Sequence, residues 1–80
     1  MKRPHPLHVH LEVSFSNRAL AHQVLWELSR IPDIVLKVLR GRVTLKEAWF
    51  RLEVDGLAGK VRDVIRRCRQ QADVVRTVPA

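Results

Sequence analysis

Hydrophobic and polar residues alternate without a break from Leu7 to Phe15. Successive side chains of a strand point to opposite sides, so this pattern predicts a strand with one buried face. The apolar positions are expected to face the core and the polar positions to share the other face. The apolar set is Leu7, Val9, Leu11, Val13 and Phe15, and the polar set is His8, His10, Glu12 and Ser14.

The next segment has the spacing of an amphipathic helix over about residues 18 to 30. Ser16-Asn17 offers an N-cap, and Pro32 forces the chain out of helical geometry just before it. One apolar stripe is predicted, made of Leu20, Ala21, Val24, Leu25 and Leu28. A helix of regular phase leaves Trp26 outside this stripe. Either the phase is shifted and Trp26 lies at the edge of the core, or it belongs to an interface.

A hairpin is predicted after this helix. Residues 34–44 are rich in β-branched residues and leucine, with a bulge or bend expected at Gly41, and residues 45–47 form the turn. Residues 48–54 alternate again. Their inward positions are Ala48, Phe50, Leu52 and Val54.

A second helix and a short last strand complete the pattern. Asp55-Gly56 is expected to cap the helix, and residues 74–78 are expected to form the strand. The buried face of this helix is predicted to hold Leu57, Val61, Val64, Ile65, Cys68 and Ala72.

Two strand-helix-strand halves joined by a hairpin predict a ferredoxin-like α+β fold, in which a four-stranded antiparallel sheet carries both helices on one face. The 80 residues are expected to form a single domain with its core over residues 7–78. The first and third strands should be central. The other face of the sheet should be uncovered, so function is to be sought there, on the edge strands or on loops.

Composition argues against an enzyme. The three glycines are scattered, no nucleophile motif is present, and the single cysteine, Cys68, falls within an apolar stripe. No cofactor is therefore expected. One cysteine, the absence of a long apolar run and a charged N-terminus favour a cytoplasmic protein with no membrane span and no signal peptide.

The formal net charge of +7 raises the question of nucleic acid. Five cations cover the outer face of the second helix: Lys60, Arg62, Arg66, Arg67 and Arg69. A solvated amphipathic face explains them most simply. RNA-binding modules of this fold stack bases on aromatic residues of the central strands, and here only Trp49 occupies such a position. Nucleic-acid binding stays the alternative function.

His8 and His10 lie two apart on the first strand, so both imidazoles point to the same side. The sequence favours solvated side chains that pair across the sheet with Trp49, Arg51 and Glu53. No metal is therefore assigned, and a metal shared by the two histidines is the weaker alternative.

Apolar residues remain on the uncovered side of the second strand whichever parity faces the helices. One side of this strand would carry Val35, Leu39 and Val43, and the other side would carry Ile34, Leu36 and Val38. A homodimer is the simplest cover for such a face. The candidate interface residues are Trp26, Trp49, Val35 and Val43.

Residues 33–44 (DIVLKVLRGRVT) followed by residues 48–56 (AWFRLEVDG) resemble the NIL domain family, and the likeness extends over about residues 7–78. The resemblance implies a ferredoxin-like fold related to ACT domains. The family includes the regulatory domain of methionine-importer ATPases and domains fused to small ferredoxins. Its name-giving Asn-Ile-Leu run falls on Lys37-Val38-Leu39, so Lys37 stands where the family has Asn.

The resemblance further implies that methionine binds near this strand, in a dimer interface. The candidate contact residues are Lys37, Val38, Leu39, Arg40 and Gly41. A lysine or arginine can bind the carboxylate of an amino acid. We therefore expect a regulatory or ligand-binding module, dimeric, that senses a sulfur amino acid or binds a protein partner in sulfur metabolism or transport.

Overall fold

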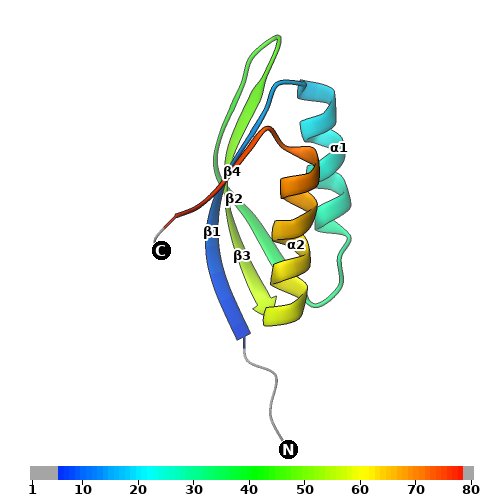
Figure 1. Cartoon of the computed structure of the whole chain (residues 1–80), viewed down its shortest axis with the longest axis vertical. Coiled ribbons are helices and arrows are strands. Elements are labelled where there is room, and N and C mark those ends of the chain that lie inside the picture. Colours follow the sequence, from blue (N-terminus) through cyan, green and yellow to red (C-terminus); the bar gives the residue numbers. More distant parts are fainter. Residues whose placement is uncertain (1–5, 79–80) are drawn as a thin grey trace, which may run out of the picture.

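The computed structural model describes residues 6–78 and has the predicted order strand, helix, strand, strand, helix, strand (Figure 1). The elements are β1 (Pro6–Phe15), α1 (Arg18–Ser29), β2 (Ile34–Val43), β3 (Ala48–Leu57), α2 (Ala58–Gln71) and β4 (Val74–Val78). Within this range neither helix is long and apolar enough to cross a membrane.

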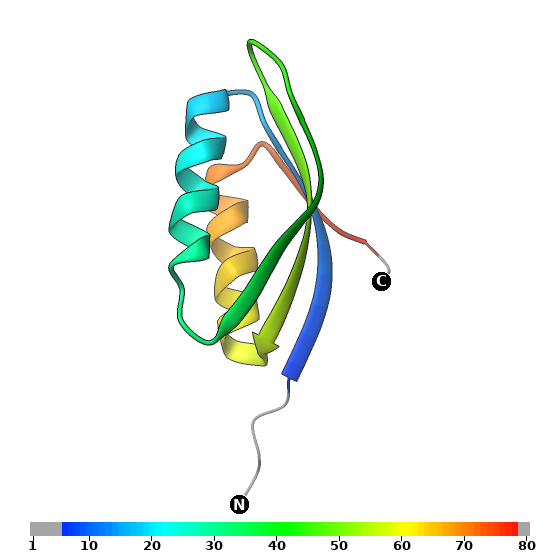
Figure 2. The ribbon, with the colours of Figure 1, turned by 180° about the vertical axis from the view of Figure 1, so that it is seen from behind.

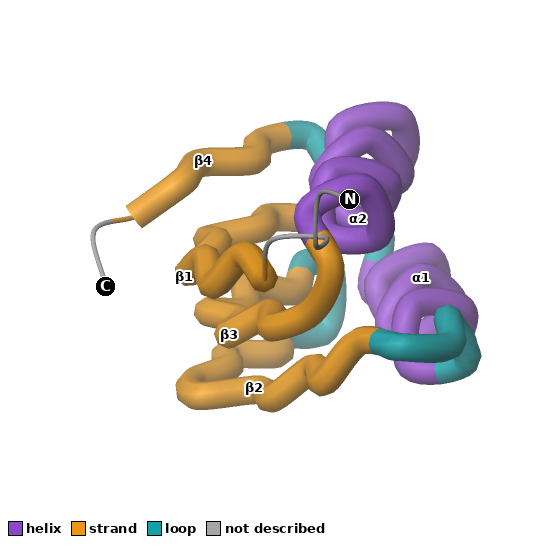
Figure 3. Tube along the Cα trace, turned by 90° about the horizontal axis from the view of Figure 1, so that it is seen from below, coloured by secondary structure: helices purple, strands orange, loops and turns teal. Residues whose placement is uncertain are grey.

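The four strands form one antiparallel sheet in the order β2-β3-β1-β4, so the first and third strands are central, as predicted. Both helices pack on one face of this sheet, and no element covers the other face within residues 6–78 (Figure 3). The uncovered face is called the open face below. The order is compatible with the expected ferredoxin-like arrangement.

The core lies between the helices and the sheet, and the strand alternation together with the helical spacing predicted its residues. It consists of Leu11, Val13, Phe15, Ala21, Val24, Leu28, Ala48, Leu52, Val54, Val61, Val64 and Cys68. Asn17 caps α1, because its Oδ1 accepts a hydrogen bond from the backbone N of Leu20 at 3.2 Å. The helix keeps the regular phase, so Trp26 is 56% exposed, and the Arg30 guanidinium lies 4.6 Å from the centre of its ring.

The predicted cap of the second helix is wrong. Asp55 and Gly56 belong to β3, and Gly56 is paired with Leu7 and Ile34. The helix starts instead after Leu57, which is an exposed N-cap without a side-chain hydrogen bond and not part of the buried face. A Cβ at position 56 would lie 2.7 Å from the carbonyl oxygen of Asp33, so the glycine permits close strand pairing.

The expected bulge at Gly41 is also wrong. Gly41 pairs in register with Phe50, and the irregularity lies between Val38 and Arg40. The glycine is needed because a Cβ there would lie 2.9 Å from the Phe50 ring. The bulge inverts the parity of β2, so Val35 shares the open face with Asp55, whereas Val43 lies opposite Ala48 on the helix side.

The β2–β3 hairpin extends past the N-terminal end of α1 (Figures 1 and 2). Its turn spans residues 44–47, one residue longer than predicted, because Thr44 leaves β2. The Oγ1 of Thr44 accepts hydrogen bonds from the backbone N of Lys46 and of Glu47, at 3.3 and 3.0 Å. The hairpin therefore presents the ends of β2 and β3 beyond the helical layer.

Candidate functional site

Polar side chains gather on the open face because alternate residues of each strand point there and directly paired residues share a face. The strand registers order them into four rows across the sheet. The rows are Val35–Asp55–His8, Lys37–Glu53–His10–Val78, Arg40–Arg51–Glu12–Arg76 and Arg42–Trp49–Ser14–Val74.

Charge is divided unequally between the two ends of this face. The third row holds three arginines and one carboxylate, Glu12, whose oxygens lie 3.3 Å from Arg51 Nη2 and 3.6 Å from Arg76 Nη2. Arg42 adds a further cation in the fourth row. The first two rows instead bring the carboxylates of Glu53 and Asp55 beside the two histidines. The hairpin end is thus cationic, and the opposite end carries carboxylates and imidazoles.

A half-open cleft of about 910 Å³ lies at the hairpin end, where all four strands contribute residues. This volume is within the range of about 300–1,000 Å³ usual for small-molecule sites. The cleft is lined by Ser14, Phe15, Ser16, Arg40, Gly41, Arg42, Thr44, Glu47, Ala48, Trp49, Asp73 and Val74. We call it the hairpin cleft.

The hairpin cleft combines three kinds of surface. Arg40 and Arg42 supply cations, and Arg42 lies directly across from Trp49 in the sheet. Glu47 and Asp73 supply carboxylates, while Trp49 with neighbouring apolar side chains supplies a hydrophobic wall. Arginine binds carboxylates through paired hydrogen bonds, and an aromatic ring packs against apolar groups or cations. Such a lining suits a zwitterion with an apolar part.

Asp73 also fixes the shape of the cleft wall. Its Oδ2 accepts a hydrogen bond from the backbone N of Ser16, and its own backbone N donates to the carbonyl oxygen of Ser14 at 2.9 Å. These bonds join the connection after β1 to the start of β4. The wall is therefore held by two segments far apart in the sequence.

The predicted contact strand divides between the cleft and its surroundings. Arg40 and Gly41 line the cleft. Lys37 lies on the open face across from Glu53, and Val38 lies across from the buried Leu52 and is itself half exposed. Leu39 is the residue at the bulge, and 43% of its surface is exposed. Only the C-terminal part of this predicted set thus reaches the cleft.

The candidate interface residues do not share one surface. Trp49 and Val35 lie on the open face, Val43 faces the helix side of the hairpin, and Trp26 lies on α1. The basic residues of the second helix, predicted as the alternative site, lie on α2, and none of them lines the hairpin cleft. One of them, Arg66, has its Nη1 3.6 Å from the Asp63 carboxylate.

Cys68 is fully buried in the core, as predicted. Desolvation by this burial raises the pKa of its thiol from 9.0 to about 11. The thiol therefore stays protonated at neutral pH and is a poor nucleophile.

Sequence reasoning missed several residues of the open face. Asp55 was assigned to a helix cap, although continuing the alternation of residues 48–54 by one further step would have placed it beside Glu53 on β3. Arg42 was missed because the bulge that sets its direction has no signal in the sequence. Asp73 and Val74 reach the cleft only through tertiary structure.

Comparison with known proteins adds no assignment, since no family model and no curated protein matches the chain. The resemblance to the NIL domain therefore rests on the residues quoted for it and stays a prediction.

Proposed function

We propose that this chain is a ligand-binding regulatory module of ferredoxin-like fold and not an enzyme, and that its ligand is a zwitterionic amino acid or a derivative of one. The observation that carries the proposal is the hairpin cleft, which places Arg40 and Arg42, two carboxylates and Trp49 around one space. The arginines would bind the ligand carboxylate, and Glu47 and Asp73 would face its ammonium group.

The apolar part of the ligand would pack on Trp49 and Val74. The NIL resemblance makes methionine and its relatives the first candidates. With Lys37 in place of the family Asn, carboxylate binding in this chain would fall to the arginines after the bulge. The cleft is larger than an amino acid requires, so adenosyl derivatives of methionine belong among the ligands to be tested.

Isothermal titration with L-methionine and S-adenosylmethionine tests the proposal. Loss of a charged hydrogen bond costs about 1.5–3 kcal/mol, so Arg42→Gln should weaken binding by about 10- to 100-fold. Trp49→Ala should weaken it as well. Arg66→Gln on α2 is the matched control and should leave affinity unchanged. Absence of heat with both ligands, or equal loss in the control, would refute the cleft assignment.

Nucleic-acid binding is the alternative, supported by the five cations on the outer face of α2 and by the net charge of +7. A gel-shift assay with random single strands tests it, because phosphate binding must weaken steeply with salt. Reversing Arg62, Arg66 and Arg69 to Glu should then abolish the shift. A shift that survives these changes but is lost in Arg42→Gln would move the polyanion site to the open face.

A further inference from the structure

Two histidines and two carboxylates face one another across the central strands of the open face, at the end away from the hairpin. In β1, His8 and His10 point to the same side, and the register pairs them with Asp55 and Glu53 of β3. The rings of the two histidines have centroids 5.2 Å apart. Both strands are central in the sheet, so their backbones hold the four side chains on a rigid base.

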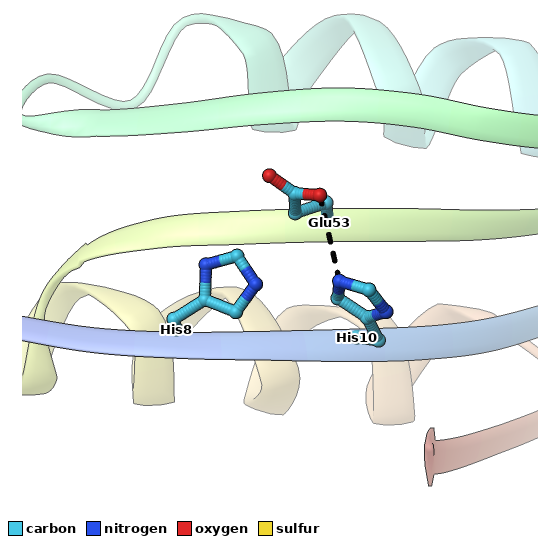
Figure 4. Close-up of side chains that lie close together, drawn as sticks. All are labelled: His8, His10 and Glu53. Carbon is cyan, nitrogen blue, oxygen red and sulfur yellow. Dashed lines mark ion pairs between the residues drawn. The ribbon is translucent and has the colours of Figure 1, made fainter. Parts of the chain in front are cut away.

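Three of these side chains converge (Figure 4). One ligand atom each from His8, His10 and Glu53 lies within 4.8 Å of the other two, and His10 Nε2 is 3.4 Å from Glu53 Oε2. Zinc binds nitrogen and oxygen at about 2.0–2.2 Å, so two ligands of a tetrahedral ion are about 3.4 Å apart. The His10–Glu53 pair already has this spacing. A gap of 4.8 Å would have to shorten by about 1.4 Å to reach this spacing, and histidine χ2, which is a broad torsion, can supply that change.

Asp55 orients the first imidazole. Its Oδ1 lies 2.5 Å from Nδ1 of His8, which leaves Nε2 as the nitrogen available for a metal. Figure 4 shows a ring nitrogen of His8 pointing toward His10. A carboxylate that accepts the other N–H of a ligating histidine is the usual outer partner in zinc sites, because it fixes the tautomer and the ring direction.

The burial of these side chains and the chemistry of their ligand atoms limit which metal ions could bind here. The side chains of His10 and Glu53 are 18% and 21% exposed, whereas His8 is 42% exposed, so the site is shielded on one side and open on the other. Two imidazoles and one carboxylate suit zinc and its neighbours in the first transition series, whereas calcium and magnesium need oxygen ligands throughout. The open side leaves room for water as a fourth ligand.

We propose that His8, His10 and Glu53 bind one divalent transition-metal ion, with zinc as the reference ion and Asp55 as the positioning residue for His8. The site is independent of the proposed amino-acid ligand. The two sites share no residue: Glu53 lies four residues along β3 from Trp49, about 13 Å at the usual rise of a strand, and the cleft residue Arg40 lies in the neighbouring row. Failure of one proposal therefore leaves the other standing.

Isothermal titration of the whole chain with zinc chloride tests the site. One ion per chain is expected. Loss of an outer partner usually weakens metal binding about 10- to 100-fold, and Asp55→Asn should fall within this range. His10→Ala and Glu53→Gln each remove a direct ligand and should weaken zinc binding by more than that. His22→Ala is the matched control, because His22 is an exposed histidine on α1 and should leave affinity unchanged.

Cobalt absorption distinguishes a residue that binds the metal from a residue that only stabilises the fold. Cobalt(II) in the wild-type chain should show the visible absorption of a four-coordinate ion, and His10→Ala should lose it while keeping the far-UV circular dichroism of the folded chain. No zinc binding, or binding that survives in His10→Ala, would overturn the proposal. Loss of binding in His5→Ala together with full binding in Glu53→Gln would overturn it too, since the ion would then sit on the N-terminal segment.

Discussion

Gly56 and Gly59 are three residues apart, yet they meet opposite surroundings. A Cβ at Gly56 would lie 2.6 Å from Cγ2 of Ile34, whereas a Cβ at Gly59, in the first turn of α2, would meet nothing within 4 Å. The first glycine is thus required by strand pairing, and the second weakens a helix without a steric reason.

Alanine at these two positions should therefore change stability in opposite directions. Gly59→Ala should raise the free energy of unfolding by about 0.5–1 kcal/mol because it removes backbone freedom of the unfolded chain. Gly56→Ala should lower it by about 1–3 kcal/mol because the added methyl overpacks the β2–β3 contact. Urea unfolding measures both. A Gly56→Ala variant as stable as wild type would contradict the pairing at this position.

Cys68 gives a pH dependence whose sign follows from its burial. Its pKa in the folded chain is about 11, above the 9.0 of an exposed thiol, so folding favours the protonated form. The stability that this group contributes is complete below about pH 9 and is lost as the pH rises toward about 11. The urea midpoint should fall over this window, and Cys68→Ala should remove this part of the fall.

The same burial should protect the thiol from reagents. At about pH 8, Ellman's reagent should react with Cys68 only after denaturant is added, since a buried neutral thiol is inert. Rapid, complete labelling of the native chain would show that the second helix opens readily.

The strands and helices that could be predicted from the sequence are those in which a single periodicity of apolar residues continues along the whole element. The alternation of residues 7–15 predicted β1 and its buried face. Of the two alternatives for Trp26, the shifted helix phase is wrong, because the side chain is exposed, and the interface role stays a prediction. The predicted boundary between β3 and α2 was wrong. Asp and Gly are common at helix caps, but here pairing with β1 and β2 extends the strand through both residues. The bulge in β2 was predicted at the wrong position. From the sequence alone, a glycine that is required because the Phe50 ring lies close looks the same as a glycine that permits a bend.

Glu12 joins β1 to both neighbouring strands, since its two oxygens contact Arg51 of β3 and Arg76 of β4. Glu12→Gln would leave three arginines in one row without a carboxylate. Because Arg76 is largely exposed, the loss in stability should be about 0.2–1 kcal/mol.

The effect of Glu12→Gln should be local to the short strand β4. Hydrogen exchange should accelerate in the amides of β4 more than in those of β2. Glu27→Gln on α1 serves as the control and should leave both strands unchanged. Equal acceleration across the whole sheet would contradict a local role.

The candidate site was less predictable than the fold. The pattern of β1 indicated the face on which His8 and His10 lie. Of the predicted cross-strand partners only Glu53 pairs with a histidine, because Arg51 pairs with Glu12 and Trp49 with Ser14. The hairpin cleft depends on the bulge in β2 and on the Ser16–Asp73 contact, which bring together residues 14–16, 40–42, 44, 47–49 and 73–74. No periodicity along the chain encodes such a contact between distant segments.

The predicted homodimer would have to cover exposed apolar side chains that lie on different surfaces of β2 and α1. They include Trp26, Val35, Val38, Leu39 and Val43. Sedimentation equilibrium should find a dimer, and Val38→Lys should shift it toward monomer by placing a charge in a desolvated contact. Leu45→Lys at the exposed turn is the matched control. A wild-type chain that stays monomeric at high concentration would contradict the prediction.

The open face has opposite chemistry at its two ends, with cations around the hairpin cleft and imidazoles beside carboxylates at the other end. The two proposed sites therefore share no residue and lie toward opposite ends of the sheet. The helical face supplies the core, and the open face carries the groups available for binding.

An NMR titration of the ¹⁵N-labelled chain with L-methionine tests directly whether the hairpin cleft binds an amino acid. We predict that the amide signals that move belong to the lining of the hairpin cleft, namely residues 14–16, 40–42, 44, 47–49 and 73–74, and that Arg42→Gln suppresses the change. Signals that stay in place throughout the titration, or that move mainly along the outer face of α2, would contradict it.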